Sequence, residues 1–262
     1  MSVIWQKEVG GTLYEVRTAG SSVRLYTGGI FHSQWNPKYP LCGSLWDLLV
    51  LPALTFYVHI TAAENLRCAV LGVGGGAVLN QLRHFFPGIQ VTGVDLDRTH
   101  LSVARNYFRL NRKNILLEHS CAIAWVEKAE PMASQYDLIV EDLFVGQALN
   151  NGKVEPARAL AVDEAWLSSL SALLNDQGTL VINFESLSQF KKACKLSVLK
   201  SLGFESILAF TKPQYHNAIG VFSRVKQVSN PRKHLMQNLE DLGALSSPIR
   251  KRVVDFKIHR VR

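Results

Sequence analysis

The stretch CAVLGVGGGAVLNQL, residues 68–82, decides the fold of this chain. It places Gly72, Gly74, Gly75 and Gly76 between a run of apolar residues and a segment with the pattern of a helix. A glycine-rich turn after a buried strand lets the backbone approach a ligand closely, and the following helix presents unpaired N–H groups at its start. The stretch therefore predicts a ligand-binding turn, although a GxGxG pattern alone also occurs in plain tight turns.

An acidic residue stands where such a turn needs a partner. Asp95 lies at the end of the second apolar run, 23 positions after Gly72. A carboxylate at that point can accept hydrogen bonds from both hydroxyls of a ribose. The pair predicts a nucleoside site. It leaves a dinucleotide and S-adenosylmethionine both open, since both ligands carry an adenosine ribose.

Strand-like and helix-like segments alternate from residue 66 onward. The expected strands are 67–73, 89–97, 115–119, 136–142, 178–185, 206–211 and 218–224, and the expected helices are 44–58, 77–86, 98–110, 122–128, 162–174 and 187–202. Buried apolar strands that alternate with helices require a parallel sheet covered on both faces. The connection 212–217 is too short for a crossover helix, so the last two strands must be antiparallel. The pattern predicts an α/β protein with a Rossmann-like sheet of seven strands.

The two ends of the chain differ from this alternating region. Short strands at 12–18 and 22–27 predict a small N-terminal β-hairpin unit, residues 1–43, ahead of a Rossmann-like domain, residues 44–225. The basic C-terminal extension, residues 226–262, carries nine Lys and Arg against three Asp and Glu, in a chain of net charge +8. It is either a solvated terminus or a surface for nucleic acid or an acidic protein.

Composition excludes several classes of protein. The chain has 262 residues, 47% of them hydrophobic, which is enough to bury a full core. Its four cysteines form no CxxC and its histidines show no ligand spacing, so we expect neither a disulfide framework nor a metal site. The apolar segment 45–60 is too short to cross a bilayer and no secretory signal opens the chain, so we expect a cytoplasmic protein without membrane contact.

Three features favour S-adenosylmethionine over a dinucleotide. The fourth strand, YDLIVED, ends in Glu141 and Asp142, where the reactive group of the ligand would lie. The sheet ends in an antiparallel pair, which a dinucleotide fold normally lacks. The 77 residues after Glu185 leave little room for a separate substrate domain. A nicotinamide-dependent dehydrogenase is the alternative that these features disfavour.

The order of these segments resembles the spermidine-synthase-like branch of the class I S-adenosylmethionine-dependent methyltransferases. The resemblance runs from about Trp5 to Arg224 through LYTGGIFHSQW, LPAL, LGVGGGAVL, VDLD, YDLIVED, GTLVINFE and HNAIGVFSR. It implies a seven-stranded methyltransferase sheet, S-adenosylmethionine or its decarboxylated form as cofactor, and a homodimer formed through the N-terminal β unit.

The resemblance also assigns cofactor-binding residues. Gly75 stands where spermidine synthases carry the Asp of a GGGDGG-like loop, which helps hold the charged tail of decarboxylated S-adenosylmethionine. The position of the adenine-contacting Asp of the family matches Cys121 here, so that contact is lost or remade. The residues expected to bind the cofactor are Gly72, Gly74, Gly75, Gly76, Asp95, Leu96, Cys121 and Ala122.

On the acceptor side, Asp142 matches the first Asp of the family's D-x-x-D-P motif, but Val145 stands at the second. The Tyr-His-Glu of the family matches Leu45-Trp46-Asp47. Burying a polyamine ammonium without a carboxylate costs several kcal/mol, so these departures disfavour aminopropyl transfer and favour methyl transfer. Asp142 is then the expected orienting group or general base; the alternative is that it only caps a loop or orders the methionine ammonium.

Two further predictions concern the substrate and a different class of function. Gln34, Trp35 and Asn217 are candidates for substrate binding, and the acceptor itself is open. The alternatives to a methyltransferase are a polyamine aminopropyltransferase and a non-catalytic module that binds a nucleoside or nucleic acid. The basic extension, and Cys121 at the position of the family's adenine-contacting Asp, motivate the last of these.

Overall fold

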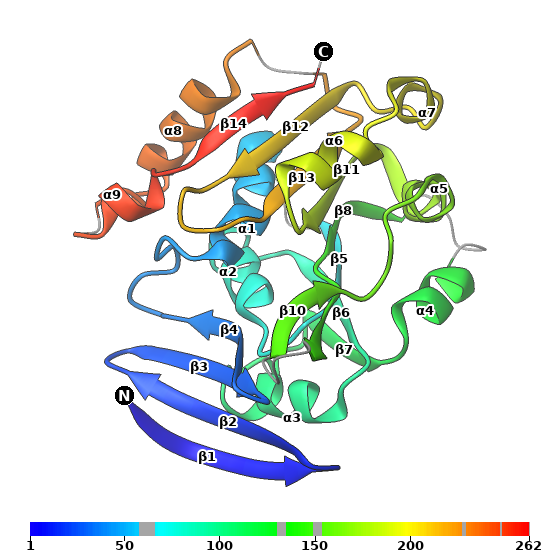
Figure 1. Cartoon of the computed structure of the whole chain (residues 1–262). Helices are drawn as coiled ribbons and strands as arrows, with labels where there is room; N and C mark the ends of the chain where they lie inside the picture. Colours follow the sequence, from blue (N-terminus) through cyan, green and yellow to red (C-terminus); the bar gives the residue numbers. More distant parts are fainter. Residues whose placement is uncertain (58–65, 130–134, 149–153, 227–228, 247, 262) are drawn as a thin grey trace.

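The strand that precedes the glycine loop lies at the centre of a large sheet. The computed structural model describes residues 1–57, 66–129, 135–148, 154–226, 229–246 and 248–261. In it, β5 (Arg67–Leu71) pairs in parallel with β6 (Gln90–Asp95) on one side and with β8 (Tyr136–Glu141) on the other. Both neighbours are strands that the alternating pattern predicts (Figure 1).

The large sheet has the order β14-β12-β13-β11-β8-β5-β6-β7. Its other strands are β7 (Ile115–His119), β11 (Leu174–Phe184), β12 (Ser206–Thr211), β13 (Ala218–Ser223) and β14 (Lys257–Arg260). β13 is antiparallel to both β11 and β12, as the short connection 212–217 predicts. The seven predicted strands are present, and β14 of the C-terminal extension adds an eighth at the edge. The expected α/β fold class is confirmed.

Helices cover both faces of this sheet. One face is covered by α1 (Leu45–Phe56), α2 (Ala77–Phe85), α3 (Arg98–Asn106) and α8 (Pro231–Asp241), and the other by α4 (Ala122–Ala129), α5 (Glu164–Ala172), α6 (Leu187–Ala193) and α7 (Leu196–Ser201). Along β5, Cys68 and Val70 face the first group, while Ala69 and Leu71 face the second. Side chains alternate across a strand, so a strand apolar on both sides serves two cores.

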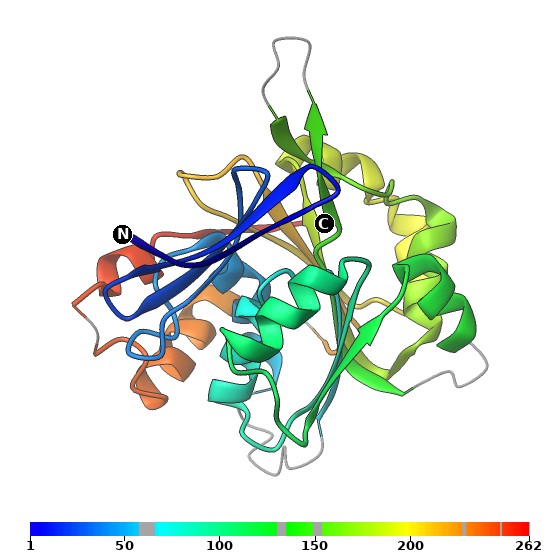
Figure 2. The same cartoon turned by 90° about the horizontal axis from the view of Figure 1, so that it is seen from below.

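The N-terminal unit is larger than the predicted hairpin. Four antiparallel strands form it, β1 (Ser2–Val9), β2 (Thr12–Ala19), β3 (Ser22–Thr27) and β4 (Ile30–Trp35). Strand β1 was not predicted because its side chains are mostly exposed and give no clear alternation. Seen from below, this sheet lies to one side of the large sheet (Figure 2).

A second unpredicted element is a hairpin made of β9 (Phe144–Ala148) and β10 (Val154–Arg158). It directly follows β8, so it rises from the carboxyl edge of the large sheet (Figure 2). Most of its residues are exposed and Pro156 interrupts the second strand, which explains the missing sequence signal. A Cβ on Gly146 would lie 3.0 Å from Ile30 Cδ1, so the hairpin packs against β4.

Predicted helix boundaries differ from the observed ones where capping or a break decides them. The predicted helix 187–202 is divided into α6 and α7 because Cys194 leaves the helical conformation, with φ −80° and ψ 67°. α5 begins after Asp163, whose carboxylate accepts a hydrogen bond from the Trp166 N–H, two residues later than predicted. The predicted end of the first helix, Val58, lies outside the described residues.

The C-terminal extension is docked onto the rest of the protein. Leu235 and Leu239 of α8 are fully buried beside α1, and the Asn238 side-chain amide donates to the Leu54 carbonyl at 2.8 Å. A short helix, α9 (Arg250–Val253), leads into β14. The division of the chain at residues 43 and 225 stays a prediction.

In the part of the chain that the structure describes, every helix is too short or too polar to cross a membrane.

The docking of α8 generates a stability prediction. Leu239→Ala should lower the free energy of unfolding by about 2–5 kcal/mol, because it removes a fully buried side chain. Lys233→Ala, on the exposed side of the same helix, should change it by less than about 0.5 kcal/mol. Urea unfolding measures both. Equal, small effects would show that the extension does not contribute to the folded core.

Candidate functional site

The glycine loop adopts backbone conformations that glycine alone adopts easily. Gly72 has φ +91°, and a Cβ there would lie 2.2 Å from the Asp142 carbonyl oxygen. Gly76 has φ +89°, and a Cβ there would lie 2.1 Å from Leu110 Cδ1. Both positions combine a left-handed backbone with a contact that excludes a side chain. The loop is therefore pressed against the end of β8 and the segment after α3.

The Asp95 carboxylate holds this loop in place. Its Oδ2 accepts hydrogen bonds from the Val73 and Gly74 N–H groups, both at 2.9 Å, and its Oδ1 accepts one from the Asp97 N–H at 2.8 Å. A carboxylate offers about four acceptor positions, two on each oxygen. Three are used by the backbone, which leaves one on Oδ1. One acceptor position on Oδ1 is therefore open to a ribose hydroxyl, and the expectation that Asp95 accepts both hydroxyls stays a prediction.

Side chains from the N-terminal sheet and from α3 contact Asp95 and Asp97. The Tyr14 hydroxyl donates to Asp97 Oδ2 at 2.7 Å, and Thr27 Oγ1 lies 2.8 Å from His100 Nε2. His100 Nδ1 lies 3.7 Å from Asp95 Oδ2. Burial by itself lowers the pKa of His100, but the hydrogen bond and charge of Asp95 outweigh it, and the pKa is raised. No sequence signal pointed to Tyr14, Thr27 or His100.

The glycine loop also rests on β4. The Gly75 N–H donates to Ser33 Oγ at 3.0 Å, and a Cβ on Gly74 would lie 3.1 Å from the His32 carbonyl oxygen. Burial, together with the nearby His100, lowers the pKa of His32 to about 4, so this imidazole is neutral at neutral pH. The HSQW segment therefore supports the loop through His32 and Ser33.

The space beside Gly75 is filled by apolar atoms. A Cβ at this position would lie 2.6 Å from Phe108 Cζ and 2.8 Å from Ser33 Cβ. Even the first atom of an aspartate side chain would therefore overlap both neighbours. The position at which the resembled spermidine synthases carry a carboxylate is closed by packing in this protein.

Asp142 ends a chain of side-chain amides. The Asn183 side-chain amide donates to Asp142 Oδ1 at 2.7 Å, and the Asn217 side-chain amide donates to Asn183 Oδ1 at 2.9 Å. Burial raises the pKa of Asp142 to about 6, against the hydrogen bond from Asn183, which lowers it. The structure thus brings Asp142 and Asn217 together through Asn183. Asn183 was missed, although a polar residue at the carboxyl end of an apolar strand was a visible signal.

Glu141, next to Asp142, lies on the opposite side of β8, as strand alternation predicts. It is fully buried and forms an ion pair with Arg158, whose Nη2 lies 2.6 Å from Glu141 Oε2. The Leu143 N–H donates to Glu141 Oε1 at 2.9 Å. The Arg158 guanidinium also donates to the carbonyls of Asn183 and Leu160. This pair anchors the β9–β10 hairpin to the end of β8.

Three of the predicted cofactor residues lie beside Asp95. Register places Asp95 opposite His119, and the Ser120 N–H donates to the Asp95 carbonyl at 3.1 Å. Leu96 is 69% exposed, Cys121 is exposed and Ala122 begins α4. The exposed Leu96 side chain, next to Asp95, offers an apolar surface on which an adenine ring could pack.

Two of the predicted substrate residues have other surroundings. The Gln34 side chain accepts a hydrogen bond from Arg24 Nε at 2.7 Å and donates to Cys42 Sγ at 3.1 Å. Trp35 lines a hollow together with Arg83 and Arg112, and no other predicted site residue borders that hollow. Their roles in substrate binding stay predictions.

Comparison with curated proteins gives two partial relatives, and no family model matches the chain. It is 30% identical over 145 residues to the N-terminal histidine N-methyltransferase of Emericella nidulans, covering 54% of this chain and 24% of the relative. It is 26% identical over 203 residues to the polyamine aminopropyltransferase of Vibrio vulnificus, covering 73% of this chain and 63% of the relative. The chain thus spans less than two thirds of each of these relatives.

Comparison with solved structures gives the fold. A probable spermidine synthase from Corynebacterium glutamicum matches with a TM-score of 0.72 at 17% identity, covering 99% of this chain and 91% of that one. Human methyltransferase-like protein 13, solved in complex with SAH, matches with a TM-score of 0.58 at 19% identity, covering 77% and 91%. The fold is the Rossmann-like fold of methyltransferases and spermidine synthases, which confirms the resemblance.

The close packing around Gly75 predicts that a larger residue at this position lowers stability. Gly75→Asp should destabilise the protein by about 1–3 kcal/mol, because the new side chain overlaps Phe108 and Ser33. The same substitution in a Phe108→Ala background should cost less, because the space beside position 75 is then open. A double-mutant cycle from urea unfolding measures the difference. An aspartate that costs nothing in either background would show that the space is not closed.

The raised pKa of Asp142 predicts how the stability of the protein depends on pH. Because this carboxyl titrates near 6 when folded and near 3.8 in its ordinary state, the folded protein loses stability as pH rises between those values. Asp142→Asn keeps an acceptor for Asn183 but cannot ionise. At pH 7.5 it should therefore be more stable than the native protein by roughly 1–3 kcal/mol, and at pH 4 the difference should vanish.

Urea unfolding at the two pH values tests this, with the exposed Asp176→Asn as the matched control. The control should show no such pH-dependent gain. A loss of stability in Asp142→Asn at pH 7.5 would mean that the ionised carboxylate makes a net attractive contact instead.

Proposed function

We propose that this protein is an S-adenosylmethionine-dependent methyltransferase, with Asp142 as the group that orients the acceptor and removes its proton. The observation that carries the proposal is the closed space at Gly75. Where the resembled spermidine synthases hold the charged tail of the decarboxylated cofactor with an aspartate, this chain has Phe108 and Ser33 side chains in contact. The similarity to a histidine N-methyltransferase over 145 residues supports the same reaction class.

The described residues fit such a cofactor. Asp95 Oδ1 has one acceptor position left for a ribose hydroxyl, and Leu96 and Ile123, 69% and 42% exposed, offer apolar surface for the adenine. Gly72 and Gly74 keep the loop free of side chains where the amino-acid arm would pass. When bound, S-adenosylmethionine supplies an activated methyl group, so the protein has mainly to align the acceptor.

Asp142 is suited to receive a proton from the acceptor. Its Oδ1 accepts the hydrogen bond from Asn183, while its Oδ2 makes no hydrogen bond to a described residue. With a pKa of about 6, the carboxyl group is mostly ionised at neutral pH, and its pKa lies close enough to 7 for it to accept a proton as a general base. A nucleophile that carries a proton, an N–H or an O–H group, fits this arrangement.

Aminopropyl transfer is the second candidate, and the similarity to a polyamine aminopropyltransferase is what favours it. Against it stands the lack of carboxylates for a polyamine. Asp47 is fully buried and accepts hydrogen bonds from the backbone of Cys42 and Gly43 and from the side chains of Ser44 and Gln81. The second acidic position of the family is Val145. A polyamine ammonium would thus find Asp142 as its counter-charge and no partner at these two positions.

Isothermal titration separates the two reactions by their cofactors. We expect S-adenosylmethionine to bind at least about tenfold more tightly than its decarboxylated form, because no carboxylate at position 75 compensates the ammonium of the latter. Methylthioadenosine, which has no amino-acid arm, calibrates the nucleoside part. Asp95→Asn should weaken all three, which shows that the titration reports this site. A clear preference for the decarboxylated form would overturn the methyl-transfer proposal.

A further inference from the structure

A basic groove lies between the N-terminal sheet and the C-terminal ends of α2 and α3. It consists of two adjoining hollows with volumes of about 560 and 390 Å³, which share Trp35, Arg83, His84 and Arg112 as walls. Its walls include Asn80, in the first turn of α2, and Phe108, which packs against Gly75, so the groove reaches close to the glycine loop. None of the residues expected to bind the cofactor is among the described residues of its walls.

The charge of this groove is of one sign. Arg83, His84, Arg109 and Arg112 line it, and no Asp or Glu is among the described residues of its walls. The side chains of Arg109 and Arg112 make no hydrogen bond or ion pair with described residues. The Arg83 guanidinium donates to Asn80 Oδ1 at 3.1 Å, but its Nε is buried without a partner.

These cations also repel one another. Burial and the nearby Arg112 both lower the pKa of Arg83, and burial and Arg83 lower the pKa of His84. Basic residues are favoured at the C-terminal end of a helix, which explains why Arg83 and His84 stand in the last turn of α2. The same effect does not explain the basic residues Arg109 and Arg112, which lie beyond α3. An anion in the groove would relieve the repulsion between Arg83 and Arg112.

The backbone fixes Arg109 at the groove. It is the one non-glycine residue with positive φ, 59°, in the part of the chain that the structure describes. This left-handed turn lets both neighbours, Phe108 and Leu110, pack beneath the glycine loop, where they contact Gly75 and Gly76. Arg109 itself is exposed and lines the groove.

Aromatic side chains stand among the arginines. Trp35 borders both hollows, and Tyr107 borders the larger one, where its ring lies 5.7 Å from that of Trp5. Aromatic faces that alternate with guanidinium groups are typical of sites for single-stranded nucleic acid, where bases stack and phosphates are neutralised. An acidic peptide would use the charges but not the exposed parts of the Trp35 and Tyr107 rings, whose other parts pack against the core.

We propose that this groove binds single-stranded nucleic acid, with phosphates on Arg83, Arg109 and Arg112 and bases on Trp35 and Tyr107. The proposal goes beyond the transferase function and does not depend on it. It also places nucleic-acid contact here rather than on the basic C-terminal extension.

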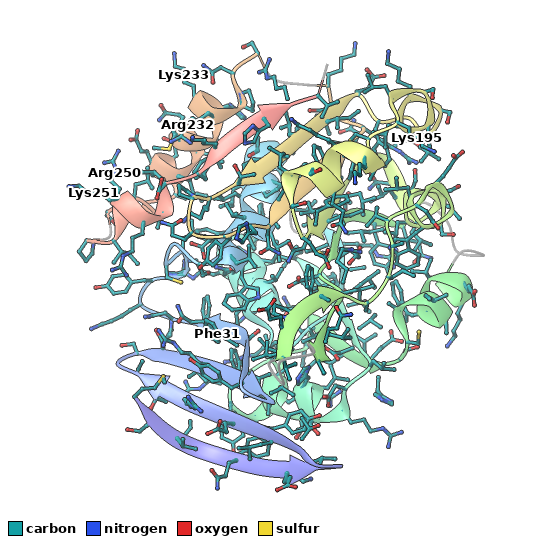
Figure 3. The ribbon with its side chains drawn as sticks, in the orientation of Figure 1. Phe31, Lys195, Arg232, Lys233, Arg250 and Lys251 are labelled. Atoms are coloured by element: carbon teal, nitrogen blue, oxygen red, sulfur yellow. The ribbon has the colours of Figure 1, made fainter. Side chains whose placement is uncertain are left out.

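In that extension, two arginines contact other residues of the extension. The Arg232 guanidinium donates to the carbonyls of Val254 and Phe256, and Arg250 forms a surface ion pair with Glu240 at 3.1 Å. Two of its exposed lysines, Lys233 on α8 and Lys251 on α9, lie at the edge of the molecule (Figure 3), and neither lines the groove. They provide a control that removes the same charge from a different surface.

Fluorescence anisotropy with a labelled oligouridylate of roughly 12 nucleotides tests the proposal on the full chain without cofactor. We expect salt-sensitive binding by the native protein. The double variant Arg109→Gln and Arg112→Gln should weaken it at least about tenfold and make the slope of log affinity against log salt shallower by about 1.4, which corresponds to two phosphate contacts on a single strand. The double variant Lys233→Gln and Lys251→Gln should bind like the native protein. Circular dichroism confirms that both variants are folded.

Three outcomes would overturn the proposal. The native protein fails to bind the oligonucleotide at low salt, the two double variants lose affinity equally, or poly-glutamate displaces the oligonucleotide as well as unlabelled oligouridylate does. The last outcome would identify the groove as a site for acidic protein segments.

Discussion

The hydrogen bonds from the Val73 and Gly74 N–H groups to the Asp95 carboxylate are the interaction on which the rest of this structure depends. They join the turn after β5 to the end of the neighbouring strand β6. The glycine loop then lies where β4 can support it from below through Ser33. His100 and Asp97 extend the same network to the N-terminal sheet, so a carboxylate at a strand end also fixes the position of the smaller sheet.

The two acidic residues at the end of β8, Glu141 and Asp142, lie on opposite sides of the strand and have different surroundings. Glu141 turns toward the β9–β10 hairpin and is neutralised by Arg158. Asp142 accepts one hydrogen bond, from the Asn183 side-chain amide, and forms no ion pair with a described residue. Burial therefore raises its pKa to about 6, although the charge of Arg158 acts in the opposite direction. A buried carboxylate without an ion-pair partner reduces stability, and groups of this kind cluster at functional sites. The difference between the neighbours comes from strand alternation alone.

Much of the fold could be predicted because buried strands and amphipathic helices have strong periodic signals. The seven strands and their alternation with helices, the antiparallel end of the sheet and the glycine loop with Asp95 all follow from the sequence. The β9–β10 hairpin and β1 could not be predicted, because their exposed residues carry no periodicity. The docking of the C-terminal extension could not be predicted, because the segment that contains the buried Leu235 and Leu239 is basic overall.

Less of the site could be predicted, because its decisive contacts join residues far apart in the chain. Gly75 is visible as a missing aspartate, but only the structure shows that Phe108 fills its place. Asn183 and His100 act through neighbours that no local spacing reveals. The dimer and the compartment stay predictions.

A crystal structure of the protein with S-adenosylhomocysteine tests most directly where the adenosyl part of the cofactor binds. We expect a ribose hydroxyl on Asp95 Oδ1, the adenine against Leu96, and Gly75 still packed on Phe108. A nucleoside bound away from Asp95, or a loop that opens at Gly75 to admit the ligand, would contradict this expectation.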